Sequence, residues 1–280
     1  MRRVPRPTAL VVQAVLGLRR RPEHRSELLN QLLLGEGVRV LARRQGWCRV
    51  ESLDDGYSGW AKDWGLKGVS AAGFARWRRQ AGHRVVALMS RLRGSMGGGE
   101  VIGPVSYGAR LSVLSRRGRF ARVQLPDERE AWIHAADLTP AGRPALSIED
   151  RLEQLSGAPY LWGGRTPLGL DCSGLTQLVL AEHGIPLPRD AHEQFAACLP
   201  LAASQTLRVG DLAFFSVAPR ARMGHVAIYL GDGFYGHARG MVRRNSFDPS
   251  SALFDKDLSA QLRAFGRPRR RTPSRPGRKR

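Results

Sequence analysis

The stretch that decides the fold of this 280-residue chain is Tyr160-Leu-Trp-Gly-Gly-Arg-Thr-Pro-Leu-Gly-Leu-Asp-Cys-Ser-Gly174. Its glycine-rich part leads into Asp171-Cys172-Ser173-Gly174, and the residues that follow, up to His183, carry apolar side chains at helical spacing. This pattern predicts that Cys172 lies at a helix start, where free backbone N–H groups and the helix dipole favour a thiolate. Cys172 is therefore a candidate nucleophile that needs a base.

Two of the seven histidines are placed to serve as that base. Residues 224–239 alternate as two strands do, and Gly231-Asp-Gly233 between them predicts a tight turn. In such a hairpin the numbers of paired residues add up to about 464, so His225 and His237 lie two residues out of register on one face. We therefore expect Cys172 as nucleophile, His225 as base and then acid, and His237 as the group that orients His225.

The elements around these residues predict the fold class. Ser147–Leu155 has the pattern of a helix capped by Ser147, and Gly157 ends it. Strands are expected within Leu207–Phe215, in the hairpin, and at Met241–Asn245. Helices followed by an antiparallel sheet predict an α+β domain.

The first half of the chain repeats itself with an offset of about 73 residues, which indicates a duplicated unit. Gly35 aligns with Gly108, and apolar positions align with apolar positions through two whole strands. Short strands separated by turns predict two small β-barrels. The alignment also places Cys48 on Ala121, which predicts a small core residue with no chemical role.

The charge composition of the chain indicates which classes of partner it attracts. The chain carries 45 Lys and Arg against 24 Asp and Glu, a formal net charge of +21. Such a charge attracts nucleic acid, anionic envelope polymer or acidic peptide, or it only solvates the surface. Residues 267–280 form a basic tail rich in Pro, Ser and Arg, which predicts disorder. No aromatic residues alternate with the basic ones there, so no specific nucleic-acid binding is predicted.

The spacing of the cysteines and the sequence of the N-terminus indicate the cellular compartment of the protein. Cys48, Cys172 and Cys198 have no CxxC spacing, which argues against a disulfide framework or a four-cysteine zinc site. Residues 1–18 partly resemble a signal peptide, but Gln13 interrupts the apolar run and no typical cleavage site follows. We expect a cytoplasmic protein, a monomer with no membrane span; secretion or association with the cell wall is the alternative.

The motifs of the last third resemble the NlpC family of cell-wall cysteine peptidases. The resemblance extends from about residue 147 to 265 and rests on Tyr160-Leu-Trp-Gly-Gly, Asp171-Cys-Ser-Gly-Leu, Pro188-Arg-Asp-Ala-His-Glu-Gln194, Gly210-Asp-Leu-Ala-Phe-Phe, Gly224-His-Val-Ala-Ile-Tyr-Leu-Gly and Gly236-His-Ala. It implies a papain-like α+β domain with a Cys-His-His triad at Cys172, His225 and His237. It also implies that Tyr160 helps to bind the oxyanion, beside the backbone N–H of Cys172.

The first half resembles bacterial SH3-type domains. Two such domains before an NlpC domain are similar to the γ-D-glutamyl-L-diamino-acid endopeptidases of murein peptide recycling. Those enzymes cut between D-Glu and diaminopimelate or lysine in peptides with a free N-terminal L-Ala, so a murein tri- or tetrapeptide is the implied substrate, with no cofactor or metal. The expected division is an SH3-type domain at 8–68, a second at 83–140, the peptidase domain at 145–266 and the tail at 267–280, with a linker or single helical turn between the first two.

The same resemblance implies residues that read the substrate's amine. Asp171 and Tyr57 match acidic and tyrosine positions with that role. A further glutamate is expected from the first domain, with Glu36 as first choice and Glu27 as second. Carboxylates that face an ammonium group suit an enzyme that requires a free N-terminus.

Three other residues match positions that line the site in the family. Ser173 and Arg189 match polar residues, and Arg189 suits a substrate carboxylate. Ala191 stands where a serine commonly follows the Arg-Asp pair, so one hydrogen bond to substrate would be missing.

Two other classes of function compete with a cysteine peptidase. Cys172, His225 and His237 are possible zinc ligands, but the sequence lacks a local ligand pair such as HxxxH. A non-catalytic protein is the other reading, in which SH3-type units bind anionic cell-wall polymer or nucleic acid through arginines.

Overall fold

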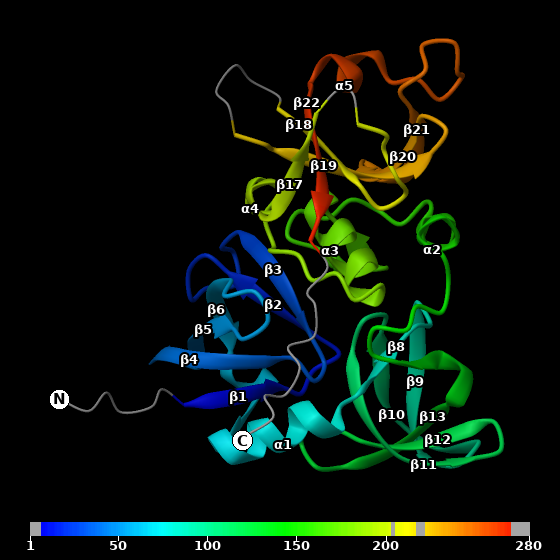
Figure 1. Cartoon of the computed structure of the whole chain (residues 1–280). Coiled ribbons are helices and arrows are strands. Elements are labelled where there is room, and N and C mark those ends of the chain that lie inside the picture. The colour runs from blue at the N-terminus through cyan, green and yellow to red at the C-terminus, as the bar shows by residue number, and fades with distance from the viewer. Residues whose placement is uncertain (1–6, 203–204, 217–221, 270–280) are drawn as a thin grey trace, which may run out of the picture.

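The protein is described by a computed structural model that covers residues 7–202, 205–216 and 222–269. Three units follow one another along the chain: a first β-barrel in blue, a second in cyan to green, and a larger unit in green to red (Figure 1). The cysteine helix α3 (Cys172–Glu182) lies in the larger unit and contacts both barrels. No helix within these ranges is long and apolar enough to cross a membrane.

The first barrel is a seven-stranded antiparallel sheet with the strand order β3-β2-β6-β5-β4-β1-β7. Its core holds Leu18, Leu32 and Val50 with Cys48, which is completely buried, so the predicted core position of this cysteine is confirmed. Its strands are β1 (Thr8–Val11), β2 (Val15–Arg19), β3 (Leu28–Leu33), β4 (Gly37–Arg44), β5 (Trp47–Ser52), β6 (Ser58–Lys62) and β7 (Leu66–Val69), with a 3₁₀ turn at Asp63–Gly65 before β7.

The second barrel repeats the first strand for strand, in the order β10-β9-β13-β12-β11-β8-β14. Gly35 and Gly108, aligned in the sequence, share a left-handed backbone with φ of 84° and 86°. The predicted duplication is confirmed. The strands are β8 (His83–Val85), β9 (Met89–Ser95), β10 (Gly98–Ser106), β11 (Arg110–Arg117), β12 (Phe120–Gln124), β13 (Glu130–His134) and β14 (Leu138–Pro140), with a 3₁₀ turn at Ala135–Asp137.

The segment between the barrels is a ten-residue helix, α1 (Ala71–Gln80), rather than a linker or a single turn. The Ser70 hydroxyl caps it by accepting the N–H of Gly73. The buried indole of Trp77 donates to the carbonyl of Gly35 at 2.8 Å and packs against Leu10. This docking against the barrels stabilises a helix that its sequence alone does not.

The third unit has the predicted α+β layout, with helices before an antiparallel sheet of order β17-β22-β18-β19-β20-β21. Ser147 caps α2 as expected, since its hydroxyl accepts the N–H of Asp150 at 3.0 Å. The remaining elements, besides α3, are α2 (Ile148–Leu155), β15 (Arg165–Thr166), β16 (Gly169–Leu170), α4 (Ala191–Ala197), β17 (Cys198–Leu201), β18 (Leu212–Phe215), β19 (His225–Gly231), β20 (Phe234–Arg239), β21 (Met241–Ser246), α5 (Lys256–Ala260) and β22 (Leu262–Pro268).

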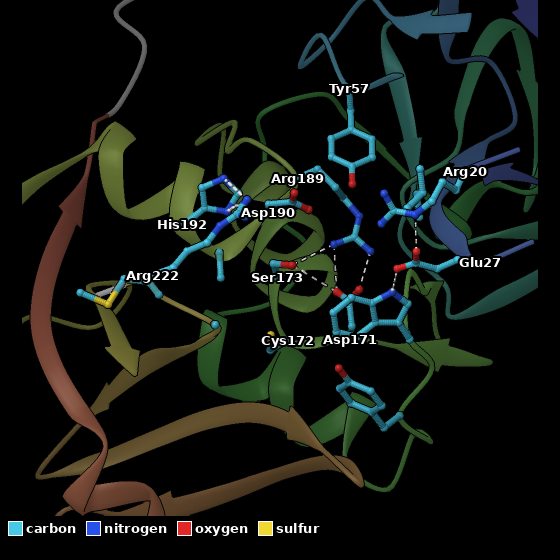
Figure 2. A pocket seen from close by; sticks show the side chains of 16 residues that line it. Arg20, Glu27, Tyr57, Asp171, Cys172, Ser173, Arg189, Asp190, His192 and Arg222 are labelled. Carbon is cyan, nitrogen blue, oxygen red and sulfur yellow. Dashed lines mark hydrogen bonds and ion pairs between the residues drawn. The ribbon is translucent and has the colours of Figure 1, made fainter. Parts of the chain in front are cut away.

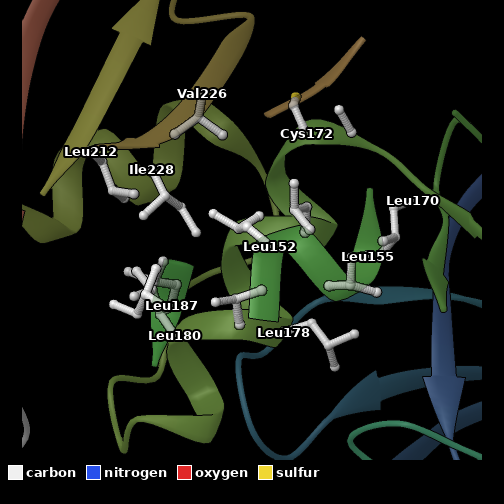
Figure 3. Close-up of a cluster of buried hydrophobic side chains, with 14 of the residues drawn as sticks. Leu152, Leu155, Leu170, Cys172, Leu178, Leu180, Leu187, Leu212, Val226 and Ile228 are labelled. Atoms are coloured by element: carbon white, nitrogen blue, oxygen red, sulfur yellow. The ribbon is translucent and has the colours of Figure 1, made fainter. Parts of the chain in front are cut away.

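Apolar burial fixes α3 between α2 and this sheet. Figure 3 shows the side chains that meet there, which include Leu152, Leu155, Leu178, Leu180, Leu212, Val226 and Ile228. Complete burial of such side chains contributes about 1.5–3 kcal/mol each. The nucleophile therefore stands at the end of a rigid element.

The last strand extends past the expected domain boundary at residue 266. In β22, Pro268 pairs with Cys198 of β17, and Arg267 forms an ion pair with Asp211 at 2.8 Å. These contacts order the first residues of the expected tail. Residues 270–280, on which most of the tail prediction falls, lie outside the described residues.

Candidate active site

The nucleophile candidate occupies the first position of its helix, as predicted. Asp171 is the N-cap of α3, and its carboxylate accepts the N–H groups of Gly174 at 2.7 Å and Gly163 at 2.9 Å. A side chain at Gly174 would meet the carbonyl oxygen of Gly164 at 2.2 Å. The glycines of the motif thus let the preceding loop press directly against the helix start that presents Cys172.

The two histidines lie on the predicted hairpin in the predicted register. Ile228 pairs with Gly236 and Tyr229 with Tyr235. Nε2 of His225 lies 2.9 Å from Nδ1 of His237, and the rings are nearly perpendicular. The structure therefore brings the two imidazoles into hydrogen-bond contact at the start of the sheet.

The residue Cys172, at the start of α3, packs against the beginning of β19. Cys172 packs in one buried cluster with Val226, the residue after His225, and the backbone N–H of Val226 partly offsets the burial that raises the pKa of Cys172. Both Cys172 and His225 are buried. The three residues expected to act together thus come from α3, β19 and β20.

A fourth residue of this group is one that the sequence interpretation missed. Nε2 of His237 lies 2.9 Å from Oδ1 of Asn245. Arg243 is the cross-strand partner of His237, and Asn245 lies two residues further along β21, on the same face. The signal available in the sequence was a polar residue at the end of the expected strand Met241–Asn245.

Burial controls the charges of these groups. It raises the pKa of Cys172 to about 11, with a further contribution from the charge of Asp171. Burial lowers the pKa of His225 to about 3, helped by His237, and lowers that of His237 to about 4. Burial thus opposes the predicted resting thiolate and favours the thiol, because loss of water acts against the helix N-terminus. A neutral thiol faces neutral imidazoles, so His225 must act as a general base.

A pocket of about 360 Å³ opens beside Cys172, between the third unit and the first barrel (Figure 2). The side chain of Tyr160 lines this pocket. Burial raises the pKa of Tyr160 to about 12, as do the charge that Cys172 carries once it is ionised and the charge of Asp171. Its hydroxyl therefore keeps its proton and can donate a hydrogen bond. The pocket is lined by Arg20, Glu27, Leu29, Tyr57, Tyr160, Trp162, Asp171, Cys172, Ser173, Arg189, Asp190, Ala191, His192, Arg222, Met223 and Gly224.

Asp171 and Arg189 form a buried ion pair with each other. Nη1 and Nη2 of Arg189 donate to the two oxygens of Asp171 at 2.9 and 2.6 Å, and Nη1 also donates to the Ser173 hydroxyl at 2.8 Å (Figure 2). Its Nε donates to Asn30 of the first barrel at 2.7 Å. Arg189 is 1% exposed. Both residues still line the pocket, so their roles toward a substrate amine and a substrate carboxylate stay predictions.

The structure also corrects the choice of glutamate. Glu36 is 3% exposed and pairs with Arg165 at 2.6 Å, away from the pocket wall. Glu27 lines the pocket instead, where it accepts from Nε of Arg20 at 2.5 Å and from the indole of Trp162 at 2.9 Å (Figure 2). The sequence could not separate the two, because each position depends on how the barrel packs against the third unit.

Tyr57 and Ala191 lie at the pocket, as expected. Burial raises the pKa of Tyr57 to about 12, and the charge of the Asp190 carboxylate adds to this rise. Ala191 begins α4 and offers no hydrogen-bonding side chain. Asp190, which the sequence interpretation did not single out, adds a carboxylate to the pocket wall.

The geometry does not suit a zinc site. Two imidazole nitrogens that face each other at 2.9 Å share a proton, so these atoms are not free to bind a metal ion together. In the part of the chain that the structure describes, no three His, Cys, Asp or Glu side chains gather closely enough to hold a metal ion.

Comparisons with known proteins agree with this arrangement. Residues 157–261 match the NlpC/P60 family, and residues 18–64 match the bacterial dipeptidyl-peptidase Sh3 domain. A Bacillus cereus protein named gamma-D-glutamyl-L-lysine dipeptidyl-peptidase is 30% identical over 223 residues, which span 74% of this chain and 66% of that protein. This chain belongs to the NlpC/P60 family. A Bacillus subtilis protein of the same name is 26% identical over 249 residues, 84% of this chain and 80% of that protein.

The shared fold extends beyond the NlpC/P60 domain. A crystal structure of an NlpC/P60 family protein from Bacillus cereus matches with a TM-score of 0.80 over 93% of this chain and 99% of that chain, at 22% identity. The architecture of two barrels and one NlpC/P60 domain is therefore a known one. Cys172, His225, His237 and Asn245 all lie within the matched NlpC/P60 range.

Proposed function

We propose that this NlpC/P60 protein is a cysteine peptidase that cuts the γ-D-glutamyl–diamino acid bond of murein peptides with a free N-terminal L-Ala. The names of the two Bacillus relatives describe a cut after γ-D-glutamate. The observation that carries the proposal is that the first barrel supplies Glu27 and Tyr57 to the pocket that also exposes Cys172. A pocket walled by a second domain suits a substrate whose short N-terminal end is enclosed.

The proposed reaction follows from the neutral resting groups. His225 takes the proton of Cys172 as the sulfur attacks the γ-carbonyl carbon of D-glutamate. The backbone N–H of Cys172 and the hydroxyl of Tyr160 stabilise the resulting oxyanion. His225 then gives the proton to the leaving amine of the diamino acid. Water, activated by His225, hydrolyses the thioester and releases L-Ala-D-Glu.

Glu27 is the proposed partner of the substrate's ammonium group. Its hydrogen bond with Arg20 and that with Trp162 lower the pKa of Glu27, so the carboxylate stays charged. Each of its oxygens accepts one hydrogen bond here and retains a lone pair for another. Tyr57 and Asp190 supply further oxygens on the same pocket wall.

The requirement for a free amine implies a place in metabolism. In intact murein the L-Ala nitrogen is part of an amide to the glycan, so a free amine marks a peptide that another hydrolase has already detached. We therefore propose a role in recycling detached murein peptides, with the cytoplasm as the compartment.

The test is incubation of the full chain with L-Ala-γ-D-Glu-diaminopimelate, or its lysine counterpart, and with the N-acetylated peptides. We expect release of the free diamino acid from the unmodified peptides only, and none from Cys172→Ala. Equal cutting of an acetylated peptide would refute the amine requirement. Binding without any cutting would favour the non-catalytic alternative, in which the SH3-type units bind anionic polymer.

A further inference from the structure

The hydrogen-bond chain that runs from His225 through His237 and Asn245 ends at a backbone carbonyl. The oxygen of Leu253 accepts the N–H of Ser246 at 2.9 Å and Nδ2 of Asn245 at 2.8 Å. A carbonyl oxygen only accepts, so the amino group of the Asn245 amide must face it. The amide oxygen of Asn245 is thereby turned toward His237.

This orientation dictates where His237 carries its proton. Oδ1 of Asn245 only accepts, so Nε2 of His237, at 2.9 Å, must be protonated. A neutral imidazole has one N–H, so Nδ1 of His237 is bare and can only accept. Nε2 of His225, 2.9 Å away, must then be the donor.

The tautomer of His225 determines which of its ring nitrogens can accept the proton of the thiol. A neutral His225 that is protonated at Nε2 has a bare Nδ1, which is the one ring nitrogen left to accept a proton from the thiol. Cys172 packs in one buried cluster with Val226, the residue that follows His225 in β19. The opposite tautomer would present an N–H to the thiol and could not act as a base.

We propose that Asn245 is a positioning residue that sets the tautomers of His237 and His225, so that His225 meets the thiol with an unprotonated Nδ1. The proposal concerns the same site as the proposed function and rests on it for the role of Cys172. Asn245 does not touch the reacting atoms and acts through both rings.

The surroundings explain why an amide is suitable at this position. The charged and titratable groups that act on His237 are Arg239, Arg243 and Asp255, besides His225. Asp255 already pairs with both arginines, at 3.1 and 3.4 Å. A neutral acceptor such as Asn245 fixes the tautomer without a further charge, which would raise the pKa of both histidines.

The direct test is the tautomer state of each ring in the free protein. In two-bond 1H–15N spectra of protein with 15N-labelled histidine, we expect protons on Nε2 and bare Nδ1 atoms for both His225 and His237. Asn245→Leu should give mixed tautomers and lower kcat roughly ten- to a hundredfold with little change in KM. Arg244→Gln is the matched control, since Arg244 lies over Phe234 on the opposite face.

Asn245→Asp separates tautomer control from a structural role. The carboxylate can still accept from His237, so both tautomers should persist, while its charge should move the acidic limb of kcat/KM to higher pH. A proton on Nδ1 of His225 in the wild type would overturn the proposal, as would unchanged tautomers or unchanged kcat in Asn245→Leu. These spectra need no substrate, so they remain decisive if the proposed substrate is wrong.

Discussion

The two barrels share one strand order but serve the third unit in different ways. In the first barrel, residues 20–27 connect β2 and β3 and bring Arg20 and Glu27 to the pocket. In the second barrel, residues 96 and 97 alone connect the equivalent strands β9 and β10. This longer loop, together with Tyr57, makes the first barrel part of the pocket wall beside Cys172.

The second barrel contacts the opposite end of the cysteine helix. The hydroxyl of Tyr107 bonds Glu182, the last residue of α3, which also pairs with Arg151 at 2.9 Å. Nη1 of Arg151 donates to the carbonyl of Val86 at 3.0 Å. The comparison shows that one barrel shapes the pocket at Cys172 while the other supports the helix that presents it.

The largest effect is expected at this support. Glu182→Gln removes the partner of the buried Arg151 guanidinium and should lower the free energy of unfolding by about 3–5 kcal/mol. Urea denaturation measures the loss, and Glu153→Gln, an exposed residue of α2, is the control. Selectivity for a free amine should survive in the folded fraction. Loss of selectivity without loss of stability would contradict the division of roles.

The second effect is a dependence of stability on pH, in which the two histidines act at higher pH than the carboxylates at the barrel contacts. The pKa values of His225 and His237 lie below the ordinary value of a histidine. Between pH 6.5 and about 4, the unfolded chain therefore binds protons at these histidines while the native protein does not. Stability therefore falls as pH falls through this window, by about 3 kcal/mol for each histidine.

The carboxylates of Glu36 and Glu182, which lie at the contacts between the barrels and the third unit, affect stability only at lower pH. The pKa values of Glu36 and Glu182 are lowered despite burial, chiefly by Arg165 and Arg151 respectively, so their contribution is lost only as pH falls below about 4.5. Urea midpoints at pH 7 and 5 should differ in the wild type and differ less in His225→Gln. An equal difference in both proteins would show that the histidines are not responsible.

The smallest effect concerns the aligned glycines. Both have positive φ, but a Cβ on Gly35 would meet the carbonyl oxygen of Arg110 at 2.5 Å, whereas one on Gly108 would meet the end of the Leu178 side chain. Gly35→Ala should cost about 2 kcal/mol or more, and Gly108→Ala about 1 kcal/mol, since a side chain can move and a backbone cannot. Thermal unfolding of the two variants checks the order, and the reverse order would contradict it.

Local patterns in the sequence were sufficient for much of the site. The position of Cys172 at a helix start, the register of His225 and His237, and the burial of Cys48 follow from spacing within one or two elements. The duplication was visible because equivalent side chains occupy equivalent strands.

Features that depend on packing between units could not be predicted. The choice between Glu36 and Glu27 depends on Arg165 and Trp162, both far away in the sequence. The helix α1 depends on a docking site for Trp77. The resting charge of Cys172 depends on its burial, which no local pattern reports.

The central claim is that the first barrel selects substrates through Glu27. The most direct test compares kcat/KM for L-Ala-γ-D-Glu-diaminopimelate and its N-acetylated form in the wild type, in Glu27→Gln and in Glu23→Gln, an exposed residue of the same loop. Loss of one charged hydrogen bond of about 2–3 kcal/mol predicts a decrease of about 30- to 150-fold in kcat/KM for the free amine in Glu27→Gln alone. Unchanged discrimination in Glu27→Gln would contradict the claim.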